Sequence, residues 1–330
     1  MKLSILDQAP IAQGQTASDA LQTSIALAQL GDRLGYERYW IAEHHDLFGL
    51  ACPNPGMMLS LIGSKTERIR IGAGAVLLPY YKPFHVAETY NLLATLYPNR
   101  VDIGLGRAPG GSAEVSLALA DNYLEQVGHF PEKVKQLNQF LSGTTPEDSL
   151  YKNISPTPVP ETSPETWILG TSEKSAHLAA DLNMPYAFGH FMSSEDGSTI
   201  VQSYREKFTA KNGRKPYVIG AIEVVCADTT EEAEQIAMSS ILWKIYQEKQ
   251  ANELTVPSLS EVEQYDFSED ERKKVAQIKK KMIIGNPTEV KEEITTLQQK
   301  YAADEWMVIT ITHDQVTKFR SYELLSQMWS

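Results

Sequence analysis

The chain is poor in cysteine, in positive charge and in long apolar runs. Of its 330 residues only Cys52 and Cys226 are cysteines, and they lie far apart without CxxC spacing, which excludes a disulfide framework and a zinc cluster. The formal net charge of −12 argues against a general attraction to nucleic acid or to an anionic membrane. No uncharged stretch approaches the ~18 residues that a membrane span needs. Any anion site must therefore be local.

The N-terminal segment, residues 1–8, has too short an apolar run for a signal peptide and soon becomes polar. We therefore expect a cytoplasmic protein. The composition, 42% hydrophobic and 22% charged, is that of an ordinary globular protein. A chain of this length buries a large core without disulfides or metals to hold it together.

Short apolar runs alternate with longer helical patterns along the chain, which is typical of βα units and a parallel sheet. The predicted strands are residues 2–7, 38–42, 69–78, 100–105, 166–169, 185–188, 217–225 and 306–311. The first helix begins at a capping-box-like Thr16 with Asp19 and ends at Gly35. Later helices are predicted at residues 84–96, 113–121, 130–142, 172–182, 197–211, 229–248, 287–299 and 314–328.

The pattern predicts an α/β fold, a single (β/α)8 TIM-barrel domain over residues 1–330. Two segments interrupt the alternation and are predicted insertions: the Pro/Thr/Ser-rich residues 143–165 and the charge-rich residues 249–284. Long excursions on a barrel are usually lids or subunit contacts. A doubly wound open sheet is the alternative fold, because counting strands does not show whether the sheet closes.

Titratable side chains follow the second predicted strand directly. Glu43, His44, His45 and Asp46 stand where that strand ends, at the rim where barrel enzymes keep their catalytic groups. Because side chains alternate across an extended backbone, we expect one of the two histidines to enter the central cavity. A histidine there titrates near neutrality and moves protons as base or acid. The alternatives are structural histidines with a rim salt bridge, or a metal site completed by His313.

Two further strand ends carry anion-binding chemistry. The turn at residues 104–111 is rich in glycine and carries Arg107, but Pro109 stands where a dinucleotide fingerprint needs glycine. Residues 170–172 supply backbone amides and hydroxyls at the start of a helix, which suits a phosphate. Each motif alone also describes an ordinary turn or helix cap, whereas together they predict a phosphorylated ligand across the barrel mouth. The small residues at 72–75 either admit a flat ligand or serve barrel packing.

Aromatic residues are a further candidate feature of the site. Trp40, Tyr80, Tyr81 and Trp306 would line an apolar substrate chamber, although aromatic side chains in a barrel more often belong to the core. The sequence alone leaves both readings open.

In this order, the motifs resemble those of the bacterial-luciferase-like flavin monooxygenases along nearly the whole chain. The matching segments are residues 35–45, 71–79, 102–107 and 168–176. The resemblance implies a (β/α)8 barrel that binds reduced FMN at the strand C-termini and reacts it with O2 to form a flavin C4a-(hydro)peroxide. It also implies a separate flavin reductase, a small apolar organic substrate and a homodimer.

The resemblance also assigns residues. It makes His44 the catalytic histidine and Arg107 the arginine that grips the FMN phosphate. The other cofactor-binding residues that it implies are Glu43, Gly74, Ala75, Gly170, Thr171, Ser172 and Ser175. Gly74-Ala75 matches the position where the family places a non-prolyl cis peptide, and no metal ligand is implied.

Two departures from the family limit what the resemblance implies. Residues 249–284 show no pattern of the luciferase mobile loop, and no second phosphate-binding arginine is found near Glu125. Light emission is therefore not implied. The alternative functions are deazaflavin-dependent hydride transfer at the same phosphate site, a non-catalytic flavin-binding protein and a metallohydrolase.

Overall fold

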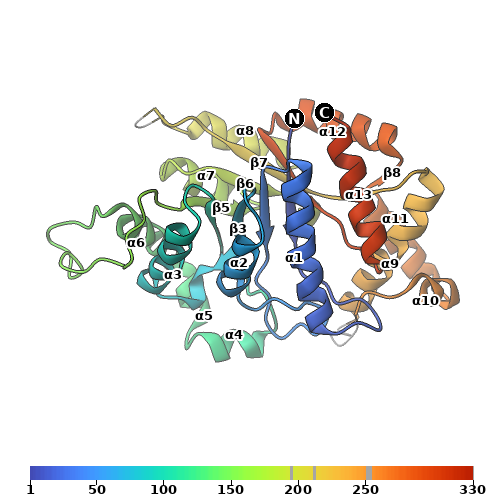
Figure 1. Ribbon diagram of the computed structural model, residues 1–330, viewed down its shortest axis with the longest axis horizontal. Helices are drawn as coiled ribbons and strands as arrows, with labels where there is room; N and C mark the ends of the chain where they lie inside the picture. Colours follow the sequence, from blue (N-terminus) through green and yellow to red (C-terminus); the bar gives the residue numbers. More distant parts are fainter. Residues whose placement is uncertain (194–195, 211–212, 250–254, 330) are drawn as a thin grey trace.

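The computed structural model describes residues 1–193, 196–210, 213–249 and 255–329, and their strands lie inside a layer of helices (Figure 1). All strand pairs are parallel, and every strand except β8 belongs to the barrel. The barrel strands are β1 (Lys2–Asp7), β2 (Arg38–Ile41), β3 (Arg70–Leu77), β4 (Val101–Gly106), β5 (Glu165–Gly170), β6 (Tyr186–Gly189), β7 (Val218–Cys226) and β9 (Glu305–Ile309).

The sheet closes through β9, which pairs with β1 on one side and with β7 on the other. Glu305 is opposite Lys2 in the first pair and opposite Ile219 in the second. The predicted barrel is therefore confirmed, and the open sheet is excluded. Each predicted strand overlaps one barrel strand.

The helices fill the connections between strands. They are α1 (Ala17–Leu34), α2 (Pro55–Ser64), α3 (Pro83–Leu96), α4 (Ala113–Leu119), α5 (Tyr123–Gly128), α6 (Phe130–Ser142), α7 (Glu173–Asp181), α8 (Gly197–Lys207), α9 (Thr230–Glu248), α10 (Leu259–Gln264), α11 (Glu269–Lys279), α12 (Pro287–Tyr301) and α13 (Gln315–Gln327), with short 3-10 turns η1 (Leu78–Tyr80) and η2 (His190–Met192). The caps predicted for α1 are present, with reciprocal Thr16–Asp19 bonds and Gly35 at φ 83°. The helix predicted over residues 197–211 ends at Lys207, and residue 211 lies outside the described residues.

Residues 249–284 contain more regular structure than the sequence predicts. Helices α10 and α11 pack against α9. Strand β8 (Ile283–Gly285) pairs with the carboxyl-terminal end of β7, where Ile283 is opposite Val224. Residues 250–254 of this segment lie outside the described residues. Among the described residues, no helix is both long enough and apolar enough to cross a membrane.

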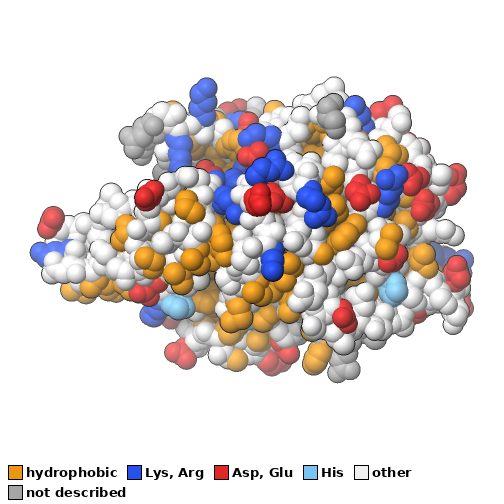
Figure 2. Space-filling model, in the orientation of Figure 1, with side chains coloured by type: hydrophobic (Ala, Val, Ile, Leu, Met, Phe, Trp, Pro, Cys, Tyr) orange, Lys and Arg blue, Asp and Glu red, His pale blue; other side chains and the backbone are white. Residues whose placement is uncertain are grey.

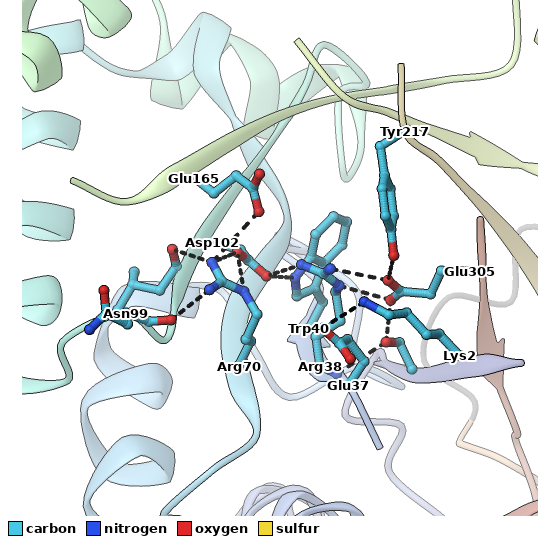
Figure 3. Close-up of polar contacts among 12 residues, drawn as sticks. Lys2, Glu37, Arg38, Trp40, Arg70, Asn99, Asp102, Glu165, Tyr217 and Glu305 are labelled. Atoms are coloured by element: carbon cyan, nitrogen blue, oxygen red, sulfur yellow. Dashed lines mark hydrogen bonds and ion pairs between the residues drawn. The ribbon is translucent and has the colours of Figure 1, made fainter. Parts of the chain in front are cut away.

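A buried ionic cluster fills the amino-terminal end of the barrel (Figure 3). Arg38 is 4% exposed and donates to Asp102 and to Glu305, each at 2.8 Å, and both carboxylates are fully buried. Arg70 pairs with Asp102 from the other side, and the Tyr217 hydroxyl donates to Glu305 at 2.9 Å. Each of these ions has a partner of opposite charge, so we interpret the cluster as a structural plug of the barrel. Ligand-binding sites of such barrels lie at the opposite end, where the strands have their carboxyl termini.

Apolar side chains pack the barrel above this plug. Trp40 and Trp167 meet edge to face at a centroid distance of 5.5 Å, and both are buried. Leu6 and Met307 belong to the same cluster. Of these side chains, Leu6, Trp40 and Met307 form the apolar floor of the space at the carboxyl-terminal end of the barrel.

Candidate active site

A cavity of about 360 Å3 opens at the carboxyl ends of the barrel strands. Its volume lies within the range of roughly 300–1,000 Å3 that is typical of small-molecule sites. The structure brings all the residues predicted for the site to this one cavity: Glu43, His44, Gly74, Ala75, Arg107, Gly170, Thr171, Ser172 and Ser175. Their individual roles remain predictions.

His44 lies in the cavity wall, three residues after β2 ends at Ile41. Its backbone N–H donates to the Cys52 carbonyl at 3.0 Å, whereas its side-chain Nδ1 is buried and has no hydrogen-bond partner within the described part of the chain. Burial, with a smaller repulsion from His45, lowers the pKa of His44 to about 4. The imidazole is therefore neutral at pH 7.

The side chains of the two neighbouring histidines point in different directions, as expected. His44 lines the cavity, whereas His45 contacts Glu43. The Glu43 carboxylate is 3% exposed and is bonded to the Tyr81 hydroxyl at 2.7 Å, to His45 Nε2 at 2.9 Å and to the Leu77 N–H at 3.2 Å. Burial and the Glu43 charge raise the pKa of Tyr81, which stays protonated and donates. Glu43 thus ties the end of β2 to the end of β3.

The end of β3 forms another wall of the cavity. The peptide bond between Gly74 and Ala75 is cis, as the family resemblance predicts. A Cβ atom at Gly74 would lie 3.0 Å from Leu6 and 3.2 Å from Trp40, so a larger residue would crowd the floor. Trp40 lines the cavity, whereas Trp306 packs over Gly220 and belongs to the core.

The loop after β4 presents Arg107 at the cavity mouth, and two tyrosines support it. The Tyr123 hydroxyl donates to the Arg107 carbonyl at 2.8 Å, and the Tyr80 hydroxyl donates to the Pro109 carbonyl at 2.6 Å. The two tyrosine rings stack with centroids 5.2 Å apart. Gly110 has φ 64°, which favours glycine in this turn. The Arg107 guanidinium is exposed and has no ion pair within the described residues, so it is available to an anion.

The start of α7 faces the same cavity. Gly170, Thr171 and Ser172 are partly exposed in its wall. Ser175 is buried instead, and its hydroxyl bonds the Ser172 carbonyl at 2.7 Å and the Tyr186 hydroxyl at 3.0 Å. Ser175 therefore shapes the first turn of α7, while the backbone amides and positive helix end at that turn are suited to a phosphate.

Sequence reasoning missed several residues of this cavity. Gln8 follows β1, and Phe191 and Met192 follow β6 in η2. None of them belongs to a recognisable motif, so position just after a strand was the available signal. The supporting contact of Tyr123 depends on the path of α5 and has no local signature.

A metal site finds no support in the described residues. They contain no group of three or more His, Cys, Asp or Glu side chains that could hold a metal ion. His313, the candidate partner of the histidine cluster, instead has its Nε2 atom 3.1 Å from the Gln13 carbonyl.

Comparisons with known proteins match this chain over nearly its whole length. A family model described as luciferase-like monooxygenase matches residues 1–304. The chain is 40% identical over 328 residues to the uncharacterized protein YceB of Bacillus subtilis (strain 168), covering 99% of each chain. It is 34% identical over 328 residues to the N-acetyl-S-alkylcysteine monooxygenase of the same organism, covering 99% of this chain and 97% of that protein.

Solved structures share the fold. Apo-MsnO8 superposes with a TM-score of 0.88 at 32% identity, covering 99% of this chain and 98% of that one. The oxygenating constituent of 3,6-diketocamphane monooxygenase from Pseudomonas putida, in complex with FMN, gives a TM-score of 0.74 at 18% identity, covering 99% and 97%. An F420-dependent secondary alcohol dehydrogenase gives 0.71 at 14% identity, covering 98% and 97%.

Proposed function

The chain belongs to the luciferase-like monooxygenase family, and we propose that it is a two-component flavin monooxygenase that uses reduced FMN and O2 to oxygenate a small apolar organic compound. A separate flavin reductase would supply the reduced FMN. One observation carries the proposal: a neutral His44, an exposed Arg107 and the start of α7 line the same cavity at the strand ends.

The residues of this cavity fit a flavin mononucleotide. Arg107 on one side and the first turn of α7 on the other would hold the phosphate, with Thr171 and Ser172 supplying hydroxyls. The glycine at position 74 leaves the backbone accessible to a flat ring above the apolar floor. The Nδ1 atom of His44 is buried, and the described part of the chain offers it no hydrogen-bond partner.

When bound, reduced FMN would supply two electrons and two protons, so that one oxygen atom of O2 enters the substrate and the other leaves as water. The protein's own part is local. Its apolar floor and walls exclude water from the reacting centre. His44, held neutral by burial, would hold or move a proton at its imidazole ring. Glu43 keeps the β2 and β3 ends in register beside it.

Thioethers are the first substrate class to test. The relative at 34% identity is named as an N-acetyl-S-alkylcysteine monooxygenase, and its named substrate carries a thioether sulfur. A thioether is apolar and accepts one oxygen atom to give a sulfoxide.

The test is an anaerobic titration of the purified protein with photoreduced FMN, followed by mixing with O2 and a thioether. We expect saturable binding and a sulfoxide yield that follows flavin oxidation. His44→Ala should keep FMN binding but release hydrogen peroxide instead of product. Absence of FMN binding by the wild-type protein would refute the proposal.

Deazaflavin-dependent hydride transfer is the alternative, because a neighbour of the same fold is an F420-dependent dehydrogenase. The same phosphate cradle would accept either cofactor. Parallel titrations with FMN and with the deazaflavin distinguish them. Tighter deazaflavin binding together with turnover that ignores O2 would favour this alternative.

A homodimer is part of the proposal. Hydrophobic side chains gather on the face over α2 and α3 (Figure 2), where Met57, Leu61, Leu92 and Leu96 are between 50% and 68% exposed. Exposed apolar patches of this kind mark protein interfaces. Light scattering on the purified protein would give the mass of the assembly. We also propose a cytoplasmic setting, where a reductase would provide reduced flavin.

A further inference from the structure

A second cavity, of about 260 Å3, lies beside the first. The two cavities share Gln8 and His44, so they adjoin at these two residues. The loop after β2 and the last turns of α9 supply the rest of the lining. Among the described residues the lining is Gln8, His44, Leu47, Gly49, Leu50, Trp243 and Gln247.

The walls of the second cavity carry no charged side chain among the described residues. Leu47, Leu50 and Trp243 are apolar, and Gln8 and Gln247 are neutral amides. His44 is uncharged at pH 7, since burial lowers its pKa to about 4. A carboxylate or ammonium group would therefore find no opposite charge among these side chains.

The nearest lysines on the same helix are already paired. Lys244 forms an ion pair with Glu223, and Lys249 forms one with Glu271 at 2.5 Å. Recruiting either lysine for an anionic ligand would break an existing ion pair. These two lysines therefore do not supply a free positive charge to the second cavity.

We infer that this second cavity is the substrate site and that it selects uncharged compounds with an apolar body and one amide- or carbonyl-type polar group. The inference rests on the proposed monooxygenase function. A flavin would occupy the first cavity, whose volume is at the small end of the range for organic ligands, so the substrate needs a separate space. His44 lines both cavities, so its side chain lies beside the occupants of each.

Gln8 and Gln247 are the specificity-determining residues in this arrangement. A glutamine side chain offers both an N–H donor and a carbonyl acceptor, which matches a neutral amide better than a carboxylate. Gln247 is exposed at the end of α9, so its substitution leaves the core intact. Gln8 is partly buried and lies in the wall shared with the first cavity.

The experiment is calorimetric titration of the full-length, FMN-saturated protein with two matched acid and amide pairs. The probes are N-acetyl-S-benzylcysteine and its primary amide, and 4-phenylbutanoate and 4-phenylbutanamide. We expect each amide to bind about tenfold or more tightly than its acid. Gln247→Arg should reverse this preference, because it installs the missing cation.

A filling variant tests the location. Leu50→Trp should weaken amide binding about tenfold or more by occupying the cavity. Phe48→Trp is the matched control, since Phe48 is on the same loop, is 64% exposed and does not line the cavity. FMN titration and circular dichroism of each variant establish that it is folded.

The outcomes separate the inference from the proposed function. If the wild-type protein does not bind FMN, the proposed function fails and the inference falls with it. If FMN binds normally but neither amide binds, or acids and amides bind equally, the inference alone is overturned. An unchanged preference in Gln247→Arg would overturn it as well, and this exposed variant is independent of the fate of Leu50→Trp.

Discussion

Replacing His44 by glutamine should change how the stability of the protein depends on pH. Burial, and to a lesser degree His45, lower the pKa of His44 from its ordinary value of 6.5 to about 4 in the folded chain. The fold therefore favours the neutral imidazole, and the unfolded chain binds a proton more readily. The associated stability is fully present above pH 6.5 and is lost as the pH falls from 6.5 toward 4. A neutral glutamine at position 44 has no such dependence.

The size of the effect follows from the two pKa values. Linkage gives a loss of about 0.8 kcal/mol at pH 6, about 2 kcal/mol at pH 5 and about 3 kcal/mol at pH 4, relative to pH 8. Removal of His44 contacts adds an offset, which is the same at every pH. The difference in unfolding free energy between wild type and His44→Gln should therefore shrink, or change sign, by these amounts on acidification.

Urea unfolding followed by tryptophan fluorescence would measure the effect, since the chain has five tryptophans. Both proteins would be measured without flavin at half-unit steps from pH 8 to pH 4.5. His190, whose pKa is also lowered by burial, is present in both proteins and cancels in the difference. A difference that stays constant across this range would show that His44 is solvated in the folded protein, contrary to the structure.

Three further substitutions test the phosphate cradle and the barrel plug. Arg107→Ala should weaken FMN binding about ten- to a hundredfold in an anaerobic titration, because a charged hydrogen bond to the phosphate contributes about 1.5–3 kcal/mol; unchanged affinity would place the phosphate elsewhere. Tyr123→Phe removes the bond to the Arg107 carbonyl and should weaken FMN binding about threefold, with riboflavin, which lacks the phosphate, as the control ligand. Arg38→Met should lower the unfolding free energy by about 3–5 kcal/mol, since Asp102 and Glu305 stay buried with a partner lost. A loss below about 1 kcal/mol would contradict this reading of the plug.

The barrel strands were predictable because each is a short apolar run bounded by polar segments. Two kinds of element could not be predicted from the sequence. Helix α2 begins at Asn54 and Pro55, an N-cap and first-turn pair that the sequence does display, but the helix is short and its apolar face is weakly periodic. Strand β8 has three residues and exists because the end of β7 offers an unpaired edge. No local pattern encodes that edge, since it arises only once the barrel closes.

The candidate site divides in the same way. Arg107, Thr171 and Ser172 directly follow strands, so chain order and the direction of a parallel sheet bring them together. Gln8, Phe191 and Trp243 reach the two cavities through the packing of separate segments. Two of them, Gln8 and Trp243, line the proposed substrate cavity, which explains why the family resemblance predicts a cofactor more readily than a substrate.

Glu43 shows how the structure refines a residue assignment based on motif resemblance alone. The resemblance places it among the cofactor-binding residues, and it does line the first cavity. Its two carboxylate oxygens are nevertheless occupied by the Tyr81 hydroxyl, His45 and the Leu77 N–H. A carboxylate with three partners has little capacity left for a ligand, and its charge would repel a phosphate. The structure therefore favours Glu43 as a positioning residue that joins the strand ends carrying His44 and Gly74, and leaves His44, which lines both cavities, as the side chain of this motif that is placed to meet a ligand.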